Sequence, residues 1–140
     1  MERHVVPGGE ELVGKTGTVV VTSPMDGVVV LRMSGNVTKE VVPSVVALVG
    51  KMFAANPIPT TYFYDLWDMS AYDSALRVEL TNWHLAHRDT LKALHAVARS
   101  RIVRMGVTVA NLALGKITSH DNRSTFEAAL RKLEHAQPSV

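Results

Sequence analysis

Short runs of β-prone residues alternate with longer helical segments along the 140 residues of this chain. The first two runs are rich in valine and flank Asp26-Gly27, a dipeptide that is typical of a hairpin turn. The strands that we expect are residues 18–22, 28–33, 61–64, 91–98 and 117–120, and the helices are residues 38–55, 75–88, 101–114 and 124–135. This alternation predicts an α/β sandwich with a mixed, mostly parallel sheet of about five strands and four helices.

The ends of the helical segments carry local signals. Thr38 is expected to cap the first helix, because a threonine side chain at that position accepts a bond from a free backbone N–H. Gly115 is expected to stop the third helix. Ser124 and Glu127 have the spacing of a capping box, which predicts the start of the last helix.

A single domain is expected from the length, since 140 residues are enough to bury one core. Residues 1–16 contain Pro7-Gly8-Gly9 and are expected to form a loose or edge segment. Residues 17–136 then form the domain, and residues 137–140 form a C-terminal tail. The apolar share of 46% and the charged share of 20% are ordinary for a soluble globular protein.

Composition argues against several functional classes. The net charge of +2 is small, and the only short basic cluster is Arg99, Arg101 and Arg104, so no nucleic-acid partner is expected. The chain has no cysteine, which excludes disulfides, thiolate metal sites and a cysteine nucleophile, and fits the reducing cytoplasm where we expect the protein. No apolar run reaches the roughly 18 residues of a membrane span, and the N-terminus lacks the apolar region of a signal peptide.

Three carboxylates and a serine follow the aromatic strand at residues 61–64. They are Asp65, Asp68, Asp73 and Ser74, and the serine opens the next helical segment. Ligands and partners of open α/β sheets meet the carboxyl ends of the strands, and a helix N-terminus favours a phosphate. These four residues are therefore the predicted partner-binding corner, with Ser74 as a candidate phosphoacceptor.

Two plainer interpretations apply at the same corner. Ser74 can serve only as the helix N-cap, which is the commonest task of a serine there. The three carboxylates can hold Mg²⁺, or can simply solvate a loop and favour the helix start, and we prefer the second interpretation. No Gly-rich phosphate cradle accompanies them in the sequence, so no cofactor is expected.

Metal and hydrolase chemistry find little support in the sequence. His84 and His87 share one side of the second helix and, with His95, could form a metal site. Their spacing matches no metalloprotease pattern, so packed or solvated histidines are preferred and no metal is expected. The chain has no Gly-x-Ser-x-Gly elbow and no base placed beside Ser74, so we expect no enzymatic activity.

The second and third helices are apolar on more than one side. One face of the third helix consists of Ile102, Met105, Val109, Leu112 and Ala113, and another of Val103, Val107, Ala110 and Leu114. A single sheet face covers one stripe of a helix, so the remaining residues need cover from neighbours, a second chain or a ligand. The surface predicted to be an interface or a wall for an apolar ligand consists of Val78, Leu85, Val103, Val107, Ala110 and Leu114.

The chain resembles the STAS domain, the anti-sigma-factor-antagonist family. That family has a strand ending in Leu-Asp-Leu, then five residues, then a hydrophobic residue with Asp-Ser at a helix start. This chain has Tyr64-Asp65-Leu66 and, after five residues, Tyr72-Asp73-Ser74. The family usually continues with a second serine or threonine and then glycine, where this chain has Ala75 and Leu76. It is most similar to the divergent SpoIIAA-like branch that is grouped with SEC14-like proteins.

This resemblance implies a SpoIIAA-like fold and a non-enzymatic role in bacterial signalling through protein–protein contacts. A kinase or regulator would then act at Ser74, or two copies would form a homodimer. The alternative is SEC14-like binding or sensing of a small apolar, lipid-like ligand between the sheet and the second and third helices.

Overall fold

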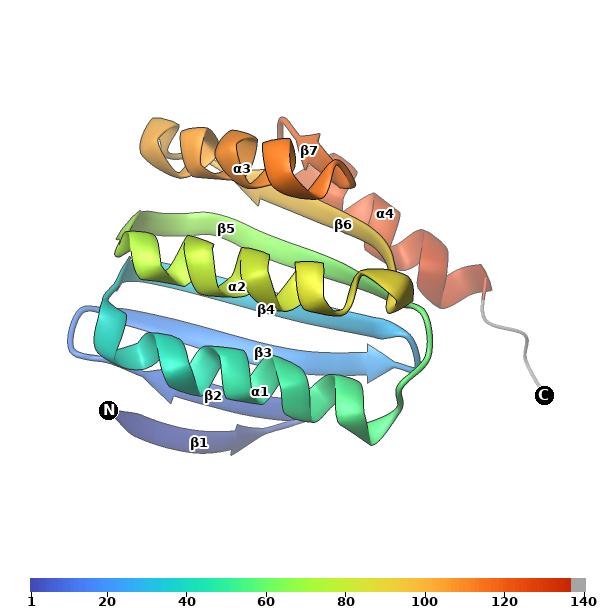
Figure 1. The fold of residues 1–140 in the computed structure, drawn as a ribbon, viewed down its shortest axis with the longest axis horizontal. Coiled ribbons are helices and arrows are strands. Elements are labelled where there is room, and N and C mark those ends of the chain that lie inside the picture. Colours follow the sequence, from blue (N-terminus) through green and yellow to red (C-terminus); the bar gives the residue numbers. More distant parts are fainter. Residues whose placement is uncertain (137–140) are drawn as a thin grey trace.

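The computed structural model describes residues 1–136 and contains one seven-stranded sheet with helices on both faces (Figure 1). The predicted tail, residues 137–140, lies outside the described residues. The strands are β1 (Glu2–Val6), β2 (Gly9–Val13), β3 (Gly17–Met25), β4 (Val28–Val37), β5 (Thr60–Tyr72), β6 (Leu91–Ala98) and β7 (Ile117–His120). The helices are α1 (Val42–Ala55), α2 (Ser74–Ala86), α3 (Arg101–Leu114) and α4 (Arg123–Ala136), with 3₁₀ turns η1 (Lys39–Val41) and η2 (Arg88–Thr90).

The strands lie in the sheet in the order in which they occur in the chain. Neighbours from β1 to β4 are antiparallel, and neighbours from β4 to β7 are parallel. The helices α1, α2 and α3 connect the parallel strands and lie on one face of the sheet, while α4 lies on the other (Figure 1). The predicted α/β class and the mixed sheet with parallel neighbours are confirmed, but the sheet has seven strands rather than about five.

The two additional strands come from the first sixteen residues. β1 and β2 form an antiparallel hairpin at the sheet edge, with Val6 paired to Gly9. Pro7 and Gly8 form the two-residue turn between them, and Gly8 has a φ of 78°, a conformation that glycine adopts without strain. The first residues therefore lie at the edge of the sheet, the second of the two expected alternatives, and residues 7–9 mark the tight turn of the hairpin.

The central correction concerns β5, which extends from Thr60 to Tyr72 instead of ending at Tyr64. Asp65 and Asp68, the carboxylates expected to follow the strand, both lie within it. Leu66 and Met69 continue the buried side of β5 beyond the aromatic run and pack in the main core. The strand carries on because its one buried carboxylate, Asp65, is paired with arginines, as described below.

Helix boundaries match the sequence closely, but the caps differ. Thr38 precedes the 3₁₀ turn η1, not α1, and its hydroxyl bonds the Glu40 side chain instead of a backbone N–H. At α4, the Asn122 side chain accepts the Thr125 N–H at 3.0 Å. Ser124 and Glu127 therefore do not form the predicted capping box, because Glu127 is drawn toward β4.

Two cores lie on opposite faces of the sheet. In β4, Val29 and Leu31 belong to the large core under α1, α2 and α3. Val28 and Val30 alternate with them and pack with Phe126 of α4 in the smaller core. Burial on both faces explains the continuous valine run of this strand.

Candidate functional site

The carboxyl ends of β4 and β5 meet at the edge of the sheet where α2 begins. Asp73 is the N-cap of α2, and its carboxylate accepts the Ala75 N–H at 2.9 Å. The Asp73 N–H donates to the Val37 carbonyl at 2.9 Å, which ties the helix start to the end of β4. Ser74 is the first residue of the helix and is exposed. The predicted Ser74 cap is therefore wrong, because the preceding aspartate already occupies the capping position.

The capping position of Asp73 gives the two neighbouring residues different expected effects on stability. Asp73→Ala should cost about 1 kcal/mol of the free energy of unfolding, because it removes the cap of α2. Ser74→Ala should change it by less than about 0.5 kcal/mol, since the exposed Ser74 is not the cap. Urea unfolding followed by circular dichroism measures both values. A larger loss for Ser74→Ala than for Asp73→Ala would contradict the placement of the cap.

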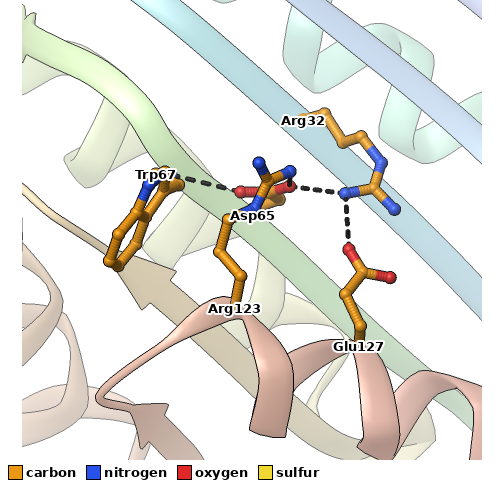
Figure 2. Close-up of polar contacts among 5 residues, drawn as sticks. All are labelled: Arg32, Asp65, Trp67, Arg123 and Glu127. Atoms are coloured by element: carbon orange, nitrogen blue, oxygen red, sulfur yellow. Dashed lines mark hydrogen bonds and ion pairs between the residues drawn. The ribbon is translucent and has the colours of Figure 1, made fainter.

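Asp65 lies away from this corner, on the face of the sheet that α4 covers (Figure 2). Its carboxylate accepts Nη1 of Arg32 from β4 and, at 2.9 Å, Nη2 of Arg123 from α4. The Trp67 N–H donates to its second oxygen at 3.2 Å, and Glu127 accepts from Arg32 at 3.1 Å. Asp65 is only 4% exposed, so this predicted partner-binding residue instead holds α4 against the sheet.

The three carboxylates of the predicted corner do not converge. Asp65 is buried among arginines, Asp68 is exposed on β5, and Asp73 caps α2. Across residues 1–136, no three histidine or acidic side chains come together in the manner of a metal site. The arrangement offers a Mg²⁺ ion separate carboxylates rather than a shared set of oxygen ligands.

An apolar cavity of about 90 Å³ lies between α2, α3 and the strands β5 and β6. Four residues of the predicted apolar surface line it, namely Val103, Val107, Ala110 and Leu114. Val103 is also 1% exposed and belongs to the main core. On α2, Val78 is 46% exposed and Leu85 is half-buried, and neither lines the cavity. The predicted surface is thus divided between a cavity wall on α3 and outward positions on α2.

A buried tyrosine–histidine pair forms part of the cavity wall. The Tyr64 hydroxyl and Nε2 of His84 are 2.6 Å apart, and His84 is 2% exposed. Burial, with a smaller contribution from the nearby His87, lowers the pKa of His84 to about 4. Burial also raises the pKa of Tyr64. Both groups are therefore neutral near pH 7 and can exchange hydrogen bonds but no charge.

The low pKa of His84 makes the stability of the fold depend on pH. The unfolded chain takes up a proton near pH 6.5, whereas folded His84 resists protonation until about pH 4. The unfolded state therefore binds more protons in this window, and about 3 kcal/mol of stability should be lost as the pH falls from 6.5 to 4. Burial also lowers the pKa values of His95 and His120, which adds loss of the same sign.

The contribution of His84 is isolated by a double variant, Tyr64→Phe with His84→Phe. It removes both partners of the hydrogen bond, so that neither leaves the other unpaired. Chemical unfolding at several pH values should show a shallower decline between pH 6.5 and 4 than the wild-type protein shows. Equal slopes for the two proteins would show that His84 is not the buried group responsible.

The three histidines considered as metal ligands have separate partners. Nε2 of His84 meets Tyr64, and Nδ1 of His87 lies 2.8 Å from the Trp83 carbonyl. His95 lies on β6, where its Nδ1 is 2.9 Å from Nε2 of His120. His84 lies in α2 and His87 is the C-cap of that helix, whereas β6 places His95 beside His120 of β7.

An exposed apolar stripe lies on α3, and its residues are not among the predicted site residues. It consists of Ile102 (60% exposed), Met105 (61%), Val109 (48%) and Leu112 (83%). The opposite side contains Gly106, where an added Cβ would lie 1.9 Å from the Tyr72 hydroxyl. The small residue Gly106 therefore marks the side of α3 that packs against Tyr72. Its position in the sequence could have indicated that the larger apolar side chains lie on the outer face.

Comparison with known proteins gives structural matches only. Neither a scan of protein-family models nor a search of curated proteins finds a match for this chain. Among solved structures, it is similar to an anti-sigma factor antagonist from Mycobacterium paratuberculosis, with a TM-score of 0.60, 21% identity, and coverage of 86% of this chain and 99% of that one. It is also similar to the anti-sigma factor antagonist SpoIIAA in its unphosphorylated form, with a TM-score of 0.63, 15% identity, and coverage of 86% and 99%.

This is a SpoIIAA-like fold. An uncharacterised protein from Shewanella loihica that is described as having the same fold matches with a TM-score of 0.60, 14% identity, and coverage of 82% of this chain and 94% of that one. The resemblance inferred from the residues around Asp65 and Ser74 is thereby confirmed at the level of the fold.

The SpoIIAA-like fold of this chain presents an exposed serine at the start of α2 and an exposed apolar stripe on α3. α2 follows β5 and α3 follows β6, so both helices begin at the edge where these parallel strands end (Figure 1). In residues 1–136, none of the helices has the length and apolar character that crossing a membrane requires.

Proposed function

We propose that this chain is a non-enzymatic regulatory domain of the STAS type that acts through protein–protein contacts at the start of α2. The observation that carries the proposal is the exposed Ser74, which follows the capping Asp73 in a fold that resembles anti-sigma factor antagonists. Asp68 and Asp73 belong to the proposed contact surface, and Asp65 does not, because it is buried. A bacterial cytoplasmic signalling role is part of this proposal, and a chain without cysteine is compatible with it.

Ser74 is the candidate phosphoacceptor. A phosphate there would enter the first turn of α2, where the helix dipole favours negative charge. The phosphate would also lie next to the Asp73 carboxylate, whose negative charge repels it. Arg77 lies one turn further along the helix, but its side chain already donates to the Tyr72 hydroxyl at 3.1 Å. A kinase partner would therefore change the charge of an exposed surface with little effect on the core.

The apolar stripe of α3 extends the proposed surface. Contiguous exposed apolar side chains are uncommon on a monomer and often mark an interaction site. The stripe begins near the N-terminus of α3 with Ile102, and Val78 is an exposed apolar residue on α2. A protein that contacts Ser74 and these side chains would bury apolar area beside a charge-sensitive position. A second copy of the chain is the other partner that this surface admits.

Site-specific cross-linking tests the proposal. A photoreactive amino acid at Val78, which is exposed on α2, should give one defined protein adduct in the cells of origin. The same group at Lys132, which is exposed on α4, is the matched control and should give none. Adducts of equal yield at both positions, or no adduct at Val78, would contradict a contact surface on α2. Mass spectrometry of the adduct distinguishes a second copy from a different protein.

A second candidate function is the binding or sensing of a small apolar ligand. The observation that favours it is the apolar cavity between α2, α3 and the sheet. A carrier of this kind should retain its ligand when it is purified without detergent. A native mass spectrum should then show a small adduct on the folded chain, and Ala110→Leu should remove it, because Ala110 lines the cavity. A single unliganded mass for the wild-type protein would contradict this function.

A further inference from the structure

We propose that the cavity between α2 and α3 binds a small, mainly apolar molecule with one hydrogen-bonding group, and that this group pairs with Nδ1 of His84. The inference rests on the second candidate function and specifies the class of ligand. It depends on three features: the volume of the cavity, its apolar lining, and one buried nitrogen that has no partner among the described residues.

The size and lining of the cavity define the body of the ligand. Its volume of about 90 Å³ is smaller than the roughly 150 Å³ of an engineered apolar cavity that binds benzene. A five-membered ring or a chain of comparable size therefore fits better than a lipid. Leu66 and Leu94 of the sheet and Leu76 and Leu80 of α2 are among the lining residues. Cavities with such walls stay free of water, and an apolar body gains the contacts that an empty space lacks.

His84 supplies the polar feature. Its Nε2 is occupied by Tyr64 at 2.6 Å, whereas Nδ1 is fully buried and has no hydrogen-bond partner in residues 1–136. A buried nitrogen without a hydrogen-bond partner is energetically unfavourable, so a partner at this position is favoured. A buried water typically needs two to four polar partners. The lining also contains Tyr72, Arg77, Thr81 and His95, of which Tyr72 and Arg77 bond each other and His95 meets His120. A ligand that brings its own polar group is the better match.

The tautomer of His84 decides which group is recognised. If the Tyr64 hydroxyl donates to Nε2, then Nδ1 carries the proton and pairs with a hydrogen-bond acceptor. If Nε2 donates to Tyr64, then Nδ1 is the acceptor and pairs with a donor. Both tautomers are neutral and offer no charge to pair with an ionised group, so the site favours a neutral polar group.

α3 forms part of the cavity wall. Val107, Ala110 and Leu114 line the cavity and are themselves only partly buried, so the wall formed by α3 is thin. Ala110 is the smallest of the three, and a leucine at this position would fill the space behind it. Ala113 lies on the exposed side of the same helix and is a matched control, because Ala113→Leu adds the same atoms outside the cavity.

Three five-membered rings of similar size test the inference. Pyrrole donates a hydrogen bond, furan accepts one, and cyclopentane does neither. Titration of the labelled wild-type protein by NMR should give at least about fivefold tighter binding for either pyrrole or furan than for cyclopentane. The Tyr64→Phe/His84→Phe double variant should bind the three rings with similar affinity. Ala110→Leu should abolish binding, and Ala113→Leu should not.

The outcomes separate this inference from the function on which it rests. If cyclopentane binds as tightly as both polar rings, the cavity is an apolar site and the role of His84 is wrong. If none of the three rings shifts the resonances of the cavity residues, both the inference and the ligand-binding function are wrong. Should the double variant fail to fold, the order of the three affinities in the wild-type protein and their loss in Ala110→Leu still decide the question.

Discussion

Val103→Asp should unfold the protein, whereas Leu112→Asp on the same helix should leave it folded. Val103 is 1% exposed in the main core, and a carboxylate there would lose its hydration among apolar side chains. The expected loss exceeds about 4 kcal/mol, which is a large part of the stability of a typical domain. Leu112 is 83% exposed, so the same change of charge at that position removes little packing.

Circular dichroism and size-exclusion chromatography of the two variants test this expected difference in folding. The Val103 variant should lose its helical signal or elute as an expanded chain. The Leu112 variant should keep the wild-type spectrum, and a change in its elution volume would reveal an assembly that depends on the α3 stripe. A folded Val103→Asp protein would contradict the packing of α3 on the sheet and would restore this residue to an interface.

Asp65→Ala should lower the free energy of unfolding by about 2 to 3 kcal/mol. The substitution leaves Arg32 and Arg123 without their shared carboxylate and removes the acceptor of the Trp67 N–H. The loss is smaller than for a wholly buried ion pair, because the two arginine side chains remain 40% and 44% exposed and can be solvated.

The matched control for this substitution is Asp68→Ala. Asp68 lies on the same strand but is exposed, so its removal should change stability by less than about 0.5 kcal/mol. Denaturant titration measures both variants, and hydrogen exchange should show faster opening of α4 only in Asp65→Ala. Equal effects of the two substitutions would show that the arginine network does not hold α4 in place.

Much of the parallel half of the fold is predictable from local sequence. The limits expected for the strand at 91–98 and the helix at 101–114 are those of β6 and α3, because a buried apolar run and the αL residue Gly115 act locally. The hairpin of β1 and β2 has no such signal, since β1 is largely exposed and neither strand has the apolar run that marks β3 and β4.

The candidate site shows why local reasoning fails at Asp65. A carboxylate in an apolar run indicates a strand end only if no cation compensates its burial. Its partners are Arg32, 33 positions earlier, and Arg123, 58 positions later. Similarly, the choice between Asp73 and Ser74 as the cap depends on where β5 ends, and that end is set by pairing with β4. Neither fact has a local signal in the sequence.

The most direct test of the proposed function is the affinity of the protein partner, identified by cross-linking at Val78, for two matched variants. Ser74→Asp and Ser124→Asp each add one negative charge at an exposed serine near a helix N-terminus, on opposite faces of the sheet (Figure 1). Calorimetry should show at least about tenfold weaker binding for Ser74→Asp, because a new charge in the contact must be desolvated. Ser124→Asp should bind like the wild-type protein. Equal affinities for the two variants would contradict a regulatory contact at the start of α2.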